Sequence, residues 1–102
     1  MHNIYDLDAE KCVLSIMITE PTKREYAFEK LKRKDFYSTW HKDIFSSILE
    51  LSRENKNIDP LTITSKMEQM GFDTESNNGV LGVVEVMNTV AFSSNMESYC
   101  KI

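Results

Sequence analysis

The chain has 102 residues, of which 41% are hydrophobic and 27% are charged. This length fits one domain, and the composition is that of a folded globular protein, which excludes a disordered chain. Only 3 Gly and 2 Pro are present, too few for the many tight turns of an all-β fold. Twelve Lys and Arg against 16 Asp and Glu give a net charge of −4, which argues against tight nucleic-acid binding, because that requires a basic surface.

No segment has the pattern of a secretory signal or a membrane span. The start is polar, and no apolar run approaches the ~18 residues that a span needs. Cys12 and Cys100 are the only cysteines, so a disulfide scaffold or a zinc site is not indicated. We interpret Cys12 as a small buried residue, and we expect a cytoplasmic protein without membrane contact.

The first predicted helix covers residues 8–18. Its apolar positions recur at helical spacing: Ala9, Cys12, Val13, Ile16 and Met17. Carboxylates crowd its start, and we interpret Glu10 as one that favours the positive end of the helix dipole. The helix ends before Pro21, because the residue that precedes a proline is pushed out of the α region.

The second predicted helix begins at Thr22, which can form a capping box with Glu25. Its inner face consists of Ala27, Phe28 and Leu31. A basic run is expected in its last turn, where cations suit the negative end of the dipole: Lys30, Lys32, Arg33 and Lys34. We interpret this run as a solvated helix end.

The third predicted helix is the most regular amphipathic segment, and we expect it to be central. It follows the link Asp35–Tyr37, is capped by Ser38 or Thr39, and extends to about residue 55. Its inward positions follow the helical period: His41, Ile44, Phe45, Ile48 and Leu51. We interpret His41 as a packed histidine that a nearby polar group satisfies.

The fourth helix is predicted to begin with Asp59 as cap and Pro60 in the first helical position. Its inward residues are Ile63, Met67 and Met70. Gly71 is predicted to close it as a left-handed residue. The polar stretch that follows, residues 73–78, is predicted to be a mobile loop.

The fifth predicted helix covers residues 79–87 and is apolar on most sides. It is rich in β-branched residues, but no second strand exists with which it could pair. A last helix is predicted from a capping box of Ser94 and Glu97. The sequence therefore predicts one all-α domain over residues 1–102, an orthogonal bundle of about six short helices without a sheet.

The sequence contains no phosphate-binding loop, dinucleotide fingerprint, nucleophile elbow or zinc-protease motif. The two histidines, His2 and His41, are far apart. We therefore expect no catalytic residue, no cofactor-binding residue and no metal ligand in this chain.

Three aromatic residues lie close together: Phe36, Tyr37 and Trp40. Such residues can form a stacking platform for single-stranded nucleic acid, but a platform needs basic neighbours on an open groove. We expect core packing for Phe36, and a protein contact for any member that stays exposed.

Four segments together resemble the N-terminal domain of DnaB-type replicative DNA helicases. In chain order they read DAEKCVL (8–14), DFYSTWHKDIF (35–45), IDPLTI (58–63) and NMESY (95–99). No single segment is specific for this family, but the four segments in this order and with these gaps are specific for it. Two positions depart from the family pattern: Ser15 replaces a usual Gly, and Val90 replaces a frequent Pro.

The resemblance implies an all-helical head that precedes a helical hairpin and a RecA-type motor, both absent from this chain. It implies a hexamer with a collar that takes part in recruiting primase or a loader. ATP, Mg and DNA would be bound only by the rest of the full-length helicase. The matching motif residues carry over as core or cap: Leu14, Phe36, Phe45, Ile58, Ile63 and Asp59.

Apolar residues of the fifth helix exceed what a small core can cover, so we expect some of them in a protein interface, in a dimer for example. The candidate interface residues are Val80, Val83, Val84, Met87, Tyr37 and Trp40. Alternatives from other classes are the helicase-binding C-terminal domain of a bacterial primase, a generic helical interaction module, a nucleic-acid-binding domain and a small enzyme.

Overall fold

The computed structural model describes residues 6–101, and within this range it contains helices and no strand. The α-helices are α1 (Leu7–Thr19), α2 (Pro21–Lys30), α3 (Thr39–Arg53), α4 (Pro60–Gln69), α5 (Val80–Met87) and α6 (Met96–Tyr99). The 3-10 helices are η1 (Arg33–Asp35), η2 (Glu75–Asn77) and η3 (Ser93–Asn95). The predicted all-α fold class is confirmed, and the apolar fifth segment is a helix, not a strand.

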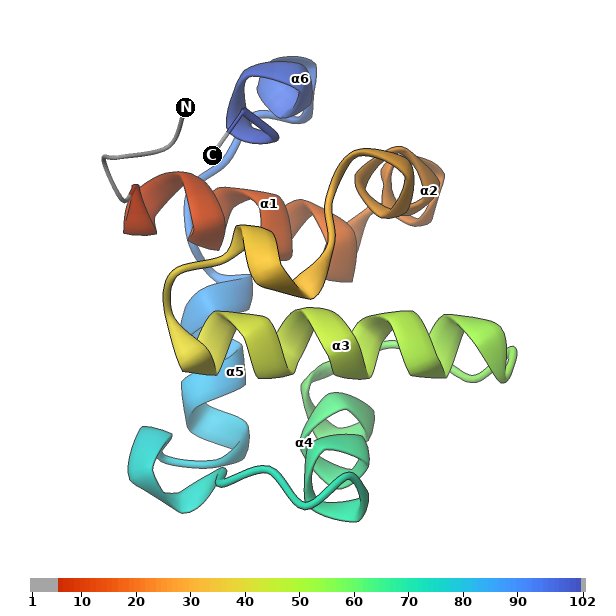
Figure 1. The fold of residues 1–102 in the computed structure, drawn as a ribbon, viewed down its shortest axis with the longest axis vertical. Helices are drawn as coiled ribbons and strands as arrows, with labels where there is room; N and C mark the ends of the chain where they lie inside the picture. The colour runs from red at the N-terminus through yellow and green to blue at the C-terminus, as the bar shows by residue number, and fades with distance from the viewer. Residues whose placement is uncertain (1–5, 102) are drawn as a thin grey trace.

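The helices cross one another and do not form a parallel bundle (Figure 1). α1 and α3 lie side by side and run in the same direction, α5 crosses behind the start of α3, and the segment after α5 passes behind α1. α5 packs against α1 and α4, while α4 also packs against α3. The core lies where these four helices meet.

The core consists mainly of the predicted apolar stripes. In α3, Ile44, Phe45 and Ile48 are at most 2% exposed, so α3 has the inner face that its sequence predicts. Leu14, Phe36 and Ile63 are also buried, and Ile58 is partly buried. The Phe45 ring centre lies 5.0 Å from that of Phe36 and 6.1 Å from that of Phe28. These rings join α2, the link and α3 in one cluster.

The start and end of α4 are set by local chemistry, as predicted. The Thr62 amide donates to Asp59 Oδ1 at 2.9 Å, and the Asp59 amide donates to Thr62 Oγ1 at 3.0 Å. Pro60 occupies the first helical position. Gly71 follows the helix with a φ of +82°, a conformation that favours glycine.

Two predicted capping boxes are wrong. α2 begins one residue before Thr22, at Pro21, because the fixed φ of proline suits the first helical position. Its cap, Glu20, makes no side-chain capping bond. Ser94 lies inside η3, so the last α-helix begins two residues later, at Met96.

Of the predicted basic run, only Lys30 lies in the last turn of α2. The helix ends at Lys30, and Leu31 is extended, so the next cations lie around η1. Arg33 donates to Asp43 Oδ1 at 2.8 Å and to Ser46 Oγ at 3.0 Å. These bonds fix η1 to α3, and the prediction of a purely solvated helix end is wrong for Arg33.

Three further positions differ from the prediction. Residues 73–78 include η2, and the buried Thr74 donates to Glu68 Oε2 at 3.1 Å. Met70 is 38% exposed, because α4 ends just before it and the chain turns away. Cys12 is only half-buried, beside the carbonyl of Val90.

Candidate protein-interaction site

The predicted interface residues of α5 lie on two different faces. Val80 is 36% exposed and Val84 is partly exposed, and the neighbouring Leu81, outside the candidate list, is 72% exposed. Val83 is fully buried, and Met87 packs against the core. The prediction is therefore corrected for Val83, whose place on the helix turns it inward. We call Val80, Leu81 and Val84 the α5 surface.

A glycine allows α5 to approach its neighbours closely. A Cβ at Gly82 would lie 1.8 Å from the Asn77 carbonyl oxygen and 3.1 Å from Trp40 Cζ2. The absence of a side chain therefore lets η2 and Trp40 pack on the helix. Sequence reasoning did not single out Gly82, because nothing local distinguishes it from a tolerated helical glycine.

The aromatic group 36–40 is divided between core and surface. Phe36 is 1% exposed, as expected for a core residue. Trp40 is half-buried at the edge of the core, next to Gly82, so it offers less surface than an exposed interface residue would. Tyr37 is 54% exposed and lies just before α3.

A buried carboxylate joins α1 to the start of α3. Glu10 is 2% exposed, and its carboxylate accepts bonds from the amides of Tyr37 at 2.8 Å and Ser38 at 3.4 Å. His41 Nδ1 lies 2.8 Å from Glu10 Oε1. The interpretation of His41 as a packed, satisfied histidine is confirmed. Glu10 lies in the first turn of α1, as interpreted, but its side chain also bonds to the segment that leads into α3, which the sequence pattern did not predict.

Burial lowers the pKa of His41, and the hydrogen bond to Glu10 only partly opposes this effect. The imidazole is therefore neutral in the folded protein near pH 7, and Nδ1–H donates to the carboxylate. A neutral histidine held in this way orients the link before α3. Its role here is explained by packing.

This lowered pKa predicts a pH-dependent stability. As the pH falls through 6.5, the unfolded chain binds a proton at His41 before the folded chain does, so the free energy of unfolding decreases. The contribution of neutral His41 to the free energy of unfolding is fully present again above this pH. Urea unfolding at a series of pH values between about 5 and 8 measures the effect. His41→Gln should remove this part of the pH dependence, and an unchanged slope in that variant would contradict the assignment.

Other groups give little sign of reactivity. Burial raises the pKa of the Cys12 thiol and raises that of Cys100 to about 11, so both thiols are protonated and weakly nucleophilic at neutral pH. Among residues 6–101, no three His, Cys, Asp or Glu side chains are grouped to hold a metal ion. Within the same range, every helix is too short or too polar to cross a membrane.

The chain is similar to the N-terminal part of replicative DNA helicases. The family model described as "DnaB-like helicase N terminal domain" matches residues 2–102. The replicative DNA helicase DnaB of Rhodothermus marinus is 30% identical over 96 residues, which cover 94% of this chain and 10% of that protein. The replicative DNA helicase DnaC of Bacillus subtilis (strain 168) is 29% identical over 97 residues, 95% of this chain and 21% of that protein.

A solved structure has the same fold. The crystal structure of the N-terminal domain of DnaB helicase from Mycobacterium tuberculosis matches with a TM-score of 0.85 at 25% identity. The match covers 95% of this chain and 69% of that chain. By contrast, the chain spans only about a tenth to a fifth of the length of these two helicases.

Proposed function

This chain belongs to the family of DnaB-like helicase N-terminal domains, and from this premise we propose that it is a non-catalytic docking domain of a cytoplasmic replicative helicase. Its role would be to assemble the hexamer collar and to recruit primase or a loader. ATP, Mg and DNA would be bound by the rest of the helicase. The matched relatives are helicases, which favours this function over the primase-domain alternative.

The observation that supports a docking role is the α5 surface. Leu81 is 72% exposed to water although it is a large apolar residue. Burying such a side chain against another protein contributes about 1.5–3 kcal/mol. Val80 and Val84 border it, so the apolar area is continuous along one side of the helix. A symmetric pair would use this same patch on both subunits.

We expect Leu81→Glu to weaken assembly of the full-length helicase, because it places a charge in the proposed interface. A loss of about 1.5–3 kcal/mol corresponds to a roughly tenfold or greater decrease in the association constant. Sedimentation velocity across a concentration series measures this. Leu61→Glu is a matched control, since Leu61 is 65% exposed on α4.

Binding of the same variants to primase separates the two proposed roles. Normal hexamers with weakened primase binding would assign the α5 surface to recruitment. Weakened hexamers would assign it to collar assembly. If Leu81→Glu changes neither property relative to Leu61→Glu, the docking role of this surface is refuted.

A further inference from the structure

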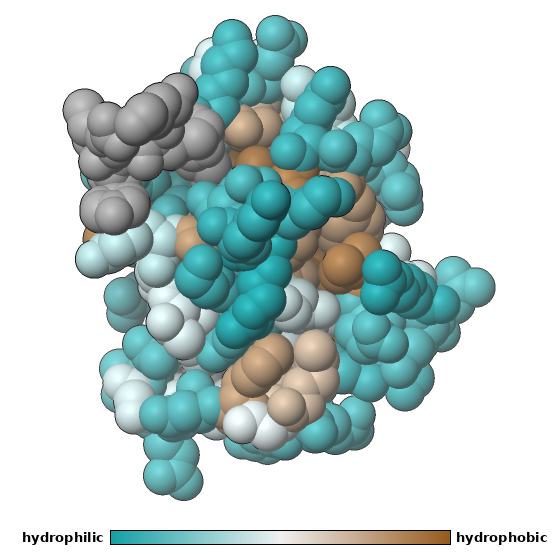
Figure 2. Space-filling view, viewed as in Figure 1, coloured by the Kyte–Doolittle hydropathy of each residue, from teal (hydrophilic) through white to brown (hydrophobic). Residues whose placement is uncertain are grey.

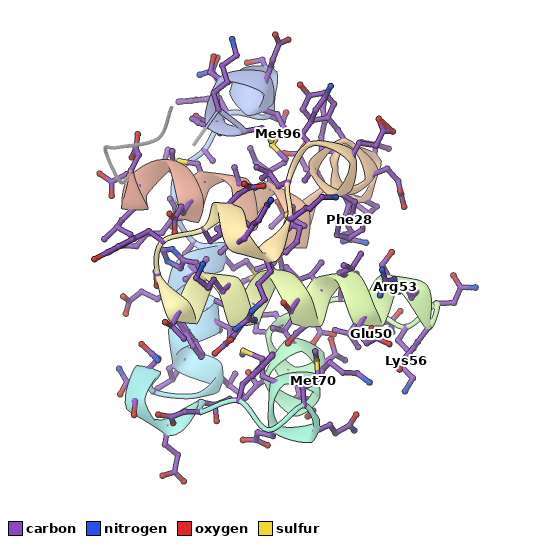
Figure 3. All side chains as sticks on the ribbon, viewed as in Figure 1. Phe28, Glu50, Arg53, Lys56, Met70 and Met96 are labelled. Atoms are coloured by element: carbon purple, nitrogen blue, oxygen red, sulfur yellow. The ribbon has the colours of Figure 1, made fainter. Side chains whose placement is uncertain are left out.

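An open groove of about 580 Å³ lies on another side of the molecule, between the end of α2, η1 and the second half of α3. Its apolar lining consists of Phe28, Leu31, Phe45, Leu49 and Met70. Figure 3 shows Phe28 between α2 and α3, and Met70 below α3. In Figure 2 brown side chains gather on this face between teal ones. The groove shares no residue with the α5 surface.

The rim of the groove is positive although the chain as a whole carries a net charge of −4. Its charged residues are the cations Lys32, Arg33 and Arg53, with Glu50 as the one carboxylate among the lining residues. Arg33 is paired with the buried Asp43 at 2.8 Å. Counting that partner too, cations still outnumber carboxylates by three to two.

The two arginines lie beside α3 at different points along its length. Arg33 bonds to Ser46, whereas Arg53 lies seven residues further along the same face of the helix. At about 1.5 Å of rise per residue, these places are roughly 10 Å apart. Arg53 forms an ion pair with Glu50 on the same helix at an N–O distance of 3.6 Å. Its side chain is 66% exposed, so a carboxylate of a partner can still reach it.

We propose that this groove binds an acidic amphipathic helix of another protein. Apolar side chains of that helix would occupy the floor formed by Phe28, Leu49 and Met70. Two of its carboxylates, seven residues apart, would match the spacing between Arg33 and Arg53. Amphipathic helices commonly bind apolar grooves in this way, and the opposite charges fix their direction and register.

A synthetic probe tests the proposal on the 102-residue chain. The probe is a cross-linked, fluorescein-labelled helix of about four turns, with three Leu on one face and two Glu seven residues apart along its border. A control probe carries Lys in place of both Glu. Fluorescence anisotropy should show saturable binding of the Glu probe, at least about tenfold tighter than that of the Lys probe at low salt.

Variants of the chain locate the binding. Arg53→Glu should weaken binding of the Glu probe about fivefold or more and strengthen that of the Lys probe. Leu49→Glu should abolish binding, and Leu61→Glu should leave it unchanged. Since Arg53 is exposed, its variant keeps the test valid even if Leu49→Glu fails to fold.

Several results would overturn the proposal. One is the absence of saturable binding, and another is equal affinity for the two probes. Binding that Arg53→Glu does not change would place the site elsewhere. If instead the chain self-associates in sedimentation and Arg53→Glu dissociates it, the groove holds a second copy of this chain and not an acidic helix of another protein.

Discussion

Replacement of Glu10 by Ala is expected to decrease the free energy of unfolding by about 3–5 kcal/mol. The carboxylate accepts bonds from the amides of Tyr37 and Ser38 and from the His41 ring. Removing it leaves the buried His41 ring and the two part-buried amides without their acceptor, and an unsatisfied buried group costs about 1–3 kcal/mol. Such a loss is a large share of the stability of a small domain.

Urea unfolding followed by tryptophan fluorescence measures this prediction, because Trp40 is the single tryptophan and lies next to His41. Asp8→Ala is the matched control, since Asp8 is an exposed carboxylate in the same first turn of α1. It should cost less than about 1 kcal/mol. Glu10→Gln keeps one acceptor oxygen and should fall between the two. Equal losses for the Glu10→Ala and Asp8→Ala variants would show that the buried bonds contribute little.

Gly82→Ala is the second change with a large expected effect. In an exposed helix this substitution stabilises by about 1 kcal/mol. Here the added Cβ would lie 1.8 Å from the Asn77 carbonyl oxygen, so the backbone must move. We expect a net loss of about 2–3 kcal/mol in the free energy of unfolding, as for other overpacked sites.

The same unfolding assay and the native fluorescence of Trp40 together measure the effect of Gly82→Ala. Trp40 Cζ2 lies 3.1 Å from the position of the new methyl group, so the emission spectrum of the folded variant should shift. Glu85→Ala, at an exposed position of the same helix, should change stability by less than about 0.5 kcal/mol. A Gly82→Ala variant as stable as the wild type would mean that η2 yields easily and does not fix α5.

The features that the sequence determined by itself are those with local causes. The cap of α4 depends on Asp59 and Thr62, which are three residues apart. The inner face of α3 follows from the helical period of its apolar residues, and Gly71 is required by the positive φ that ends α4. For the same reason the all-α fold class and the family resemblance of four short segments could be predicted from the sequence.

Tertiary structure alone decided which side chains meet and which stay exposed. Glu10 and His41 are 31 residues apart, and no spacing rule connects them. Arg33 leaves the helix end expected for it because Asp43 lies within reach. On α5, residues 81 and 83 are both apolar, yet only one of them is buried, since the neighbours of the helix cover one side. Periodicity defines an apolar face, but the packing of distant segments determines how much of that face water can reach.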